Sequence, residues 1–253
     1  MDDDQSTPNC VRIGGELPDR PTLIEGLPGH GLVASIAVDQ ITDQLGLDHH
    51  ANIQSDDFPP VVTFDDGLVQ NLVRVYAGEN PPVMTLQSDL ALPQSAYRPL
   101  SECVLSTMAT EYRKAIFLVG APAEHEEQLG NVTGVATTAD IRSELEAAGI
   151  DIARERGVVG GVTGALVREC HRSEIPAALL IVRAHPRIPD PGAAKAVIET
   201  ALEPLVDFDI DTSELEERAD EIQQQLQQIA RQYQEMSQER DEPSEPRTMG
   251  MYQ

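Results

Sequence analysis

The sequence predicts an α/β fold in which a mixed, largely parallel β-sheet is covered by helices on both faces. Short apolar runs rich in β-branched residues alternate with segments of helical periodicity along most of the chain, which is the pattern of such sheets. A length of 253 residues with 40% hydrophobic residues is sufficient for a core of this kind. We predict that this domain spans residues 11–211, after a polar and disordered segment at 1–10.

The first predicted elements surround a glycine-rich turn. A strand at 22–25 leads into the turn at 26–31, and a helix at 32–45 follows with its apolar residues on one face. Three β-rich segments come next, at 61–64, 68–76 and 83–86. The pair Asp66-Gly67 predicts a hairpin turn between the first two of these segments.

The remaining elements of the domain continue the alternation. The run at 115–120 is apolar without interruption, as expected of a strand that is buried on both faces. The other predicted strands are at 132–137 and 177–182, and the predicted helices are at 95–112, 138–148, 160–170 and 192–205. Gly149 is a typical residue after the end of a helix, and Pro189-Asp190-Pro191 introduces the last one.

The charge of the chain is strongly negative. Asp and Glu number 43 against 18 Lys and Arg, for a net charge of -25, and Lys114 and Lys195 are the only lysines. Such self-repulsion costs stability in dilute buffer and is screened in molar salt, where the Debye length falls to about 3 Å. We therefore predict a halophilic, archaeal type of protein. The absence of a basic patch argues against a nucleic-acid partner.

Targeting signals and cysteine pairing are not apparent. No stretch is long and apolar enough to span a membrane, and the first residues are acidic where a signal peptide is basic. Cys10, Cys103 and Cys170 are widely spaced, odd in number and without a CxxC pattern. We expect a cytoplasmic protein with reduced thiols and no membrane partner.

The glycine-rich turn is a possible ligand site. Gly29-x-Gly31-x-x-Ala34 follows a strand and opens a helix, as in a dinucleotide-binding fingerprint, and Gly26 belongs to the same turn. Glycines at such a position allow a phosphate to approach the backbone. They are also what a tight turn and close packing of a helix on a sheet require. A second glycine cluster at 157–164 has the same two interpretations.

Catalytic and metal-binding patterns are not found. Ser35 and Ser106 lie in helical patterns rather than in a nucleophile elbow, and the six histidines lack metal-ligand spacing. The acidic segment at 124–127 is interpreted as a solvated loop. We therefore predict a protein that is not an enzyme and that has no cofactor and no bound metal.

The composition changes after Asp211, where we predict an amphipathic coiled-coil helix at 212–240. Its apolar residues recur at alternating steps of four and three, which is a heptad pattern. They are Leu215, Ala219, Ile222, Leu226, Ile229, Tyr233 and Met236. Because the stripe is narrow and the other faces are polar, we predict that it forms a homo-oligomer. The alternative is that the helix packs against its own domain.

The last segment, 241–253, is predicted to be a flexible tail that ends in a docking motif. Its first part contains two prolines and no apolar residue, but Met251-Tyr252-Gln253 restores large apolar side chains beside the terminal carboxylate. A tyrosine next to a free carboxylate suits a pocket that has an apolar wall and a cationic group.

Four segments form an ordered set of motifs. They are the glycine motif at 26–34 (GLPGHGLVA) and later blocks at 132–137 (VTGVAT), 160–166 (GGVTGAL) and 189–191 (PDP). Together they span about residues 20–210, and in kind and order they resemble the proteasome assembly chaperone 2 family. The closing Met251-Tyr252-Gln253 is similar to the hydrophobic-tyrosine-any tail with which proteasome activators engage the core particle.

The resemblance implies a three-layer sandwich similar to nucleoside phosphorylases, self-association and no established catalysis. It also implies that the tail enters pockets between α-subunits of the proteasome core, where the Gln253 carboxylate meets a lysine and Tyr252 packs. The leading prediction is a proteasome-binding assembly chaperone or an ATP-independent activator-like adaptor. The alternatives are a nucleotide- or nucleoside-binding protein or enzyme that uses the turn at 26–31, and a purely structural assembly scaffold.

Overall fold

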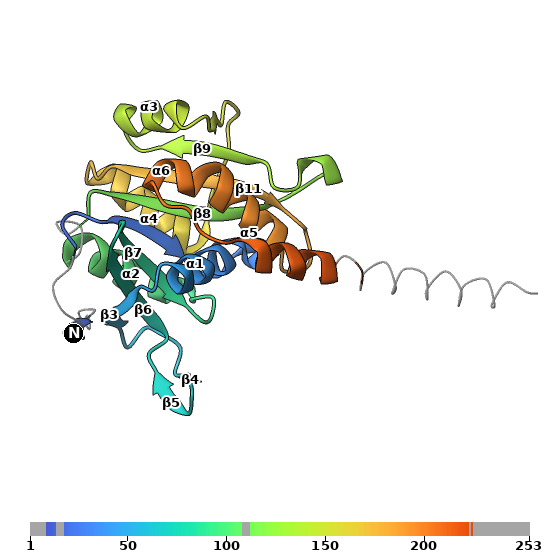
Figure 1. The fold of residues 1–253 in the computed structure, drawn as a ribbon. Helices are drawn as coiled ribbons and strands as arrows, with labels where there is room; N and C mark the ends of the chain where they lie inside the picture. The colour runs from blue at the N-terminus through green and yellow to red at the C-terminus, as the bar shows by residue number, and fades with distance from the viewer. Residues whose placement is uncertain (1–8, 14–17, 108–111, 223, 225–253) are drawn as a thin grey trace, which may run out of the picture.

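The structure is a computed structural model, and it describes residues 9–13, 18–107, 112–222 and 224. A nine-stranded sheet forms the centre of the molecule, and helices cover both of its faces (Figure 1). The predicted three-layer α/β sandwich with a mixed, largely parallel sheet is therefore confirmed. The predicted disordered segment 1–10 falls almost entirely outside the described residues, apart from the start of the first strand.

The sheet is parallel at its centre and has antiparallel pairs on both sides of this centre. Its strand order is β1-β3-β6-β7-β2-β8-β11-β9-β10. The bounds are β1 (Asn9–Arg12), β2 (Thr22–Gly26), β3 (Asp48–Gln54), β6 (Val73–Glu79), β7 (Pro82–Ser88), β8 (Lys114–Pro122), β9 (Val132–Ala136), β10 (Asp151–Ile152) and β11 (Ala177–Ala184). Strands β7, β2, β8 and β11 run parallel to one another, whereas β9 is antiparallel to β11 and the β1–β3–β6–β7 ladder is antiparallel throughout.

Helices cover the two faces of the sheet in separate groups (Figure 1). One face carries α1 (Val33–Gln44), α3 (Ala139–Ala147), α5 (Pro191–Val197), the π-helical turn η4 (Ile198–Leu202) and α6 (Glu203–Val206). The other carries α2 (Gln94–Glu102), its π-helical continuation η2 (Cys103–Thr107) and α4 (Gly161–Arg172). Two 3-10 turns, η1 (His30–Leu32) and η3 (Glu126–Gln128), lie in connecting segments.

The core consists of two apolar layers that are separated by the sheet. Because successive side chains of a strand point to opposite faces, β8 supplies both layers. Ala115 and Phe117 pack under α2 and α4, while Ile116 and Leu118 pack under α1 and α3. All four side chains are fully or almost fully buried. This confirms the prediction of a strand that is buried on both faces at 115–120.

Two predicted segments are divided in the structure. The run 68–76 contains the end of a separate hairpin and the start of β6, because the chain leaves one sheet and enters another between residues 70 and 73. That hairpin is formed by β4 (Thr63–Asp65) and β5 (Leu68–Gln70), with Asp66-Gly67 as the predicted turn. The helix predicted at 192–205 changes to π-helical geometry at η4, just before Pro204.

Strand β3 was not predicted because buried polar residues hide its pattern. Its sequence is DHHANIQ, in which His50 and Asn52 are 5% exposed. Only Ala51 and Ile53 are buried apolar residues in this strand. Polar side chains in such positions do not produce the apolar alternation from which strands are recognised.

Lys114 joins the sheet to the helices of one face. Its ammonium group donates hydrogen bonds to the Glu144 carboxylate on α3 and, at 2.9 Å, to the carbonyl oxygen of Leu205 on α6. Burial lowers the pKa of Lys114, while the Glu144 carboxylate opposes that shift. The side chain thus fixes the amino end of β8 to two helices.

Candidate functional site

A ligand-binding site in this fold is expected at the carboxyl ends of β2 and β8. The chain runs from β2 into α1 on one face of the sheet, and from β7 through α2 on the other face into β8. Strands β7 and β8 lie on either side of β2. In open α/β sheets, ligands bind in the crevice where connections leave to opposite faces. The glycine turn at 26–31 lies at the carboxyl end of β2, next to this crevice.

Two glycines of the turn are required by packing and backbone conformation. A β-carbon on Gly26 would lie 2.5 Å from the Cβ atom of Val38 on α1. Gly31 has φ of +64°, and a β-carbon there would lie 3.0 Å from that of Ala184. Gly29 is different, because a β-carbon there would meet no atom within 4 Å. Gly29 is therefore the member of the proposed ligand turn whose surroundings are open, and ligand binding there stays a prediction.

Backbone contacts hold the turn against two neighbouring segments. A β-carbon on Gly120 of β8 would lie 2.0 Å from the carbonyl oxygen of His30, so only glycine allows this approach. The backbone N–H of Asp190 donates to the Gly31 carbonyl oxygen at 2.9 Å. The Asp190 carboxylate accepts hydrogen bonds from the N–H groups of His185 and Ala193, the second as the N-cap of α5. These contacts fix the turn to β8 and to the segment before α5.

Glu25, the residue before the turn, is a fully buried carboxyl group that sequence reasoning missed. One of its oxygens accepts hydrogen bonds from the Leu27 N–H at 3.2 Å and from the Thr163 hydroxyl at 3.1 Å. The other accepts from the Leu118 N–H at 3.3 Å. The available signal was an acidic residue inside an otherwise apolar strand, TLIEG.

Burial raises the pKa of Glu25 to about 8, and its three hydrogen bonds oppose this shift without cancelling it. At neutral pH the group therefore carries a proton for most of the time. Its partners come from β8, α4 and the turn itself. Glu25 acts as a polar junction between these elements, and the contacts around it are those of a structural group.

Two surface grooves flank the sheet. The first, named here the acidic groove, has a volume of about 880 Å³ and lies beyond the ends of β8 and β11. Its walls include Glu124, Glu126 and Asp190, which belong to the segments 123–130 and 185–193. The second, named the arginine groove, has a volume of about 650 Å³ and lies between α2 and α4. Its walls include Arg98, Arg168 and Arg172.

The predicted oligomerisation residues divide at the limit of the described chain. A helix begins at residue 213 and is described to residue 222. Leu215 is 1% exposed and belongs to the domain core, while Ala219 and Ile222 are half-buried along the acidic groove. Leu226, Ile229, Tyr233 and Met236 lie outside the described residues. The role of the heptad in oligomerisation therefore stays a prediction.

The predicted docking residues Met251, Tyr252 and Gln253 also lie outside the described residues, as does the whole segment 241–253. In the part of the chain that the structure describes, His, Cys, Asp and Glu do not assemble in threes as a metal would require. None of the described helices combines the length and hydropathy needed to cross a bilayer. Cys103 and Cys170 are buried and form no disulfide, and burial raises the pKa of Cys170 to about 12.

Sequence comparison decides the family. Residues 23–230 match the PAC2 family, and this range includes most of the described residues. The chain belongs to the PAC2 family. An uncharacterized protein of Methanocaldococcus jannaschii, MJ0106, is 29% identical over 181 residues, which cover 72% of this chain and 74% of that protein.

Solved structures share the fold. PbaA of Pyrococcus furiosus, described as an archaeal homolog of proteasome-assembly chaperone, matches with a TM-score of 0.79 and 24% identity over 93% of this chain and 96% of its own. PbaB of the same organism, described as an archaeal proteasome activator, matches with a TM-score of 0.79 and 21% identity over 89% of this chain and 99% of its own. These likenesses confirm the architecture that the sequence predicts.

Proposed function

We propose that the protein binds the proteasome core as an assembly chaperone or as an ATP-independent, activator-like adaptor. The observation that carries the proposal is the combination of a PAC2-family domain with the sequence Met251-Tyr252-Gln253. PbaA and PbaB, whose descriptions name proteasome assembly and proteasome activation, support the same role. The tail is proposed to enter pockets between α-subunits, with Tyr252 against the apolar wall and the Gln253 carboxylate on a cationic group.

The anchoring of the C-terminal helix supports this arrangement. Leu215 fixes the start of the helix in the core, and Lys195 on α5 holds Glu216 at 2.7 Å. The point from which the chain leaves the domain is therefore rigidly placed. Met251 is fifteen positions after Met236, and an extended chain of that length reaches about 50 Å. Several tails on one oligomer would gain avidity because each bound tail keeps the others close to their pockets.

A binding role without catalysis is consistent with the groups found at the sheet edge. Glu25 is satisfied by three donors, and Gly26 and Gly31 are occupied by packing. The family and the structures of PbaA and PbaB point in the same direction.

The test is capture of a purified archaeal proteasome core in molar salt by the full chain and by its variants. Removal of residues 251–253, or Tyr252→Ala, is expected to reduce capture at least about tenfold, because the anchor of a docking motif carries most of its affinity. Ser244→Ala, in the same segment, is the matched control and should bind as the unaltered chain does. Equal capture by the truncated and unaltered chains would exclude docking by the tail.

Two further readouts separate the proposed roles. An activator raises peptide hydrolysis by the mature core, whereas an assembly chaperone raises the yield of cores formed from separate subunits. Both effects should require Tyr252. An increase in neither, with binding intact, would leave the adaptor as the remaining form of the proposal.

A further inference from the structure

The hairpin formed by β4 and β5 stands away from the body of the molecule (Figure 1). Residues 61–70 are named here the arm. Its large apolar side chains are mostly in solvent, with exposed fractions of 43% for Val61, 67% for Val62, 75% for Phe64, 71% for Leu68 and 75% for Val69. They are five of the eleven exposed large hydrophobic side chains of the described chain. Apolar side chains gathered in this way mark interaction surfaces.

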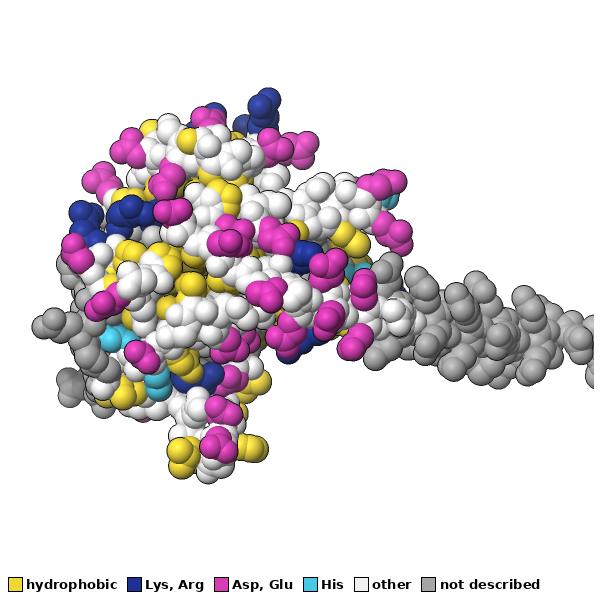
Figure 2. Space-filling model, in the orientation of Figure 1, with side chains coloured by type: hydrophobic (Ala, Val, Ile, Leu, Met, Phe, Trp, Pro, Cys, Tyr) yellow, Lys and Arg dark blue, Asp and Glu magenta, His cyan; other side chains and the backbone are white. Residues whose placement is uncertain are grey.

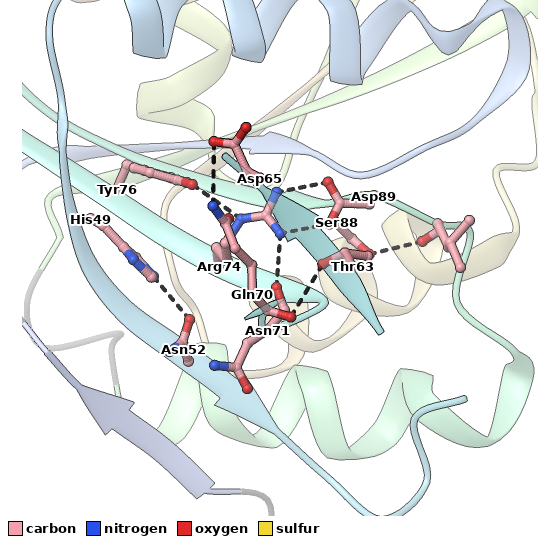
Figure 3. Close-up of polar contacts among 11 residues, drawn as sticks. His49, Asn52, Thr63, Asp65, Gln70, Asn71, Arg74, Tyr76, Ser88 and Asp89 are labelled. Carbon is pink, nitrogen blue, oxygen red and sulfur yellow. Dashed lines mark hydrogen bonds and ion pairs between the residues drawn. The ribbon is translucent and has the colours of Figure 1, made fainter. Parts of the chain in front are cut away.

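The root of the arm is fixed by a buried arginine (Figure 3). The Arg74 guanidinium is bound by both carboxylate oxygens of Asp89, at 2.6 and 2.7 Å, and donates to the Asn71 carbonyl oxygen at 2.8 Å. Arg74 is only 8% exposed, and it holds the pKa of Asp89 below its usual value. Gln54 on β3 also donates to the side chain of Asn71 at 2.9 Å. The sheet therefore holds the arm in a defined position at its base.

The arm presents apolar side chains on both of its faces. Phe64 and Val69 are paired across the two strands, so they lie side by side on one face. Leu68 is paired with Asp65 and lies on the other face. Asp65 and Asp66 add two exposed carboxylates at the tip, and acidic side chains are visible between the apolar ones in Figure 2. A surface of this form fits a slot with apolar walls and a cationic rim.

The arginine groove between α2 and α4 has these properties. Tyr97, Leu105 and Ala165 contribute to its lining, and Tyr97 and Leu105 pack against the core beneath it. Arg98 pairs with Glu102 at 2.7 Å, and Glu169 is shared by Arg168 and Arg172. Three arginines against two glutamates leave this groove with one net positive charge on a chain whose net charge is -25.

The charge of the two grooves decides between them. Glu124, Glu126 and Asp190 line the acidic groove, so its walls would repel the carboxylates at the tip of the arm. We propose that the arm of one copy of this chain docks into the arginine groove of a second copy. Arm and groove are different surfaces, so the contact is heterologous and joins copies head to tail into a ring or an open chain.

This contact assigns self-association to the folded domain rather than to the heptad residues. It does not depend on the tail or on binding to the proteasome. Apolar contacts of Phe64, Leu68 and Val69 persist in molar salt, whereas the charged rim is screened there. The charged pairs set which groove is used, and they are best measured at the lowest salt in which the chain is folded.

The test is the mass of the full-length chain in solution, followed by light scattering over a range of concentrations. Phe64→Ser with Leu68→Ser is expected to weaken self-association about tenfold or more, because such residues act as anchors. Val158→Ser, which alters a side chain that is 98% exposed on another segment, is the matched control and should leave the mass unchanged. Neither change touches the core, so the unfolding midpoints should be equal at a dilution where both chains are monomeric.

A charge exchange tests the pairing itself. Asp65→Arg with Asp66→Arg, and separately Arg168→Asp with Arg172→Asp, should each dissociate the oligomer at low salt. The two altered chains should associate again when they are mixed. The chain with the groove substitutions then offers an acidic groove to the basic arm of the other chain. A monomeric unaltered chain, an oligomer unaffected by the arm substitutions, or a mixture that fails to associate would each overturn the proposal. Tyr252→Ala should leave all of these masses unchanged, which separates this contact from docking to the proteasome.

Discussion

The two glycine-rich segments of the chain resemble each other in sequence and differ in what surrounds them. In the turn after β2, the Val38 side chain fills the space beside Gly26. Gly31 combines a positive φ with a close approach to the Ala184 side chain. At the start of α4, β-carbons on Gly160 and Gly161 would meet no atom within 4 Å, whereas one on Gly164 would lie 2.4 Å from the carbonyl oxygen of Val159. Glu25 joins the two segments, because one oxygen accepts hydrogen bonds from both Leu27 and Thr163. Glycine spacing alone therefore does not tell a packing role from an open one.

The largest expected effect on stability is at Gly26, in the turn after β2. Gly26→Ala should lower the free energy of unfolding by about 3 kcal/mol, because overpacking at a site that cannot relax costs this much. The obstructing atom is the Cβ of Val38, which is fixed to the backbone of α1. Urea unfolding at constant pH measures the loss. A loss below about 0.5 kcal/mol, the range of ordinary surface changes, would mean that Val38 does not obstruct a side chain at this position.

The junction at Glu25 should make stability depend on pH. Its pKa is raised from 4.5 to about 8 in the folded chain, so the folded state binds an extra proton between these values. The resulting stabilisation is fully present below pH 4.5 and is lost progressively as the pH rises to about 8. The slope is at most about 1.4 kcal/mol per pH unit.

Glu25→Gln removes this titration and isolates its contribution. The variant is expected to be less stable at pH 5, because one backbone donor then faces an amide N–H group. The difference from the unaltered chain should shrink as the pH rises to 8 or 9. Thermal unfolding at several pH values measures this difference, and parallel curves for the two proteins would contradict the assignment.

The positive backbone angles give a smaller contrast. Gly31→Ala meets both φ of +64° and Ala184 at 3.0 Å, whereas Gly161→Ala meets only φ of +71°. The left-handed conformation costs an L-residue about 1–2 kcal/mol, so Gly161→Ala should lose about that amount and Gly31→Ala more. Equal losses in urea unfolding would show that Ala184 yields without cost.

The smallest effect on stability is expected at Gly29. Its φ of -146° is extended backbone that any residue adopts, and the space around it is open. Gly29→Val should change the free energy of unfolding by no more than about 0.5 kcal/mol. If the turn binds nucleotides or nucleosides, these ligands should raise the melting temperature of the unaltered chain but not of this variant. No shift with either protein would count against the ligand turn.

The sequence predicted those parts of the fold in which the apolar pattern and the packing coincide. Strand β8 is an example, since Ile116, Phe117 and Leu118 are apolar and are all buried. Prediction from the apolar pattern failed at β3, where the polar residues His50 and Asn52 are buried. It also failed at Glu25, which accepts hydrogen bonds from the distant residues Leu118 and Thr163. Such partners become visible only when distant segments meet in three dimensions.

The arm shows a second limit. Asp66-Gly67 predicted its turn, and the apolar residues around it predicted strands. Periodicity does not say whether a hairpin joins the main sheet or stands apart from it. Here Arg74 and Asp89 direct the chain away from the sheet, and neither residue belongs to the hairpin. Leu215 is a comparable case, because the heptad pattern assigns it to an oligomer contact while the structure buries it in the domain core.

The burial of Lys114 has a practical consequence for chemical labelling. Besides the amino terminus, the chain offers amine reagents only Lys114 and Lys195, and Lys114 is 3% exposed. The Lys195 side chain is 26% exposed, and its hydrogen bond to Glu216 raises its pKa, so alkaline buffer is needed for reaction. A fluorophore or cross-linker at Lys195 would then report from the junction between α5 and the C-terminal helix of the unmutated protein.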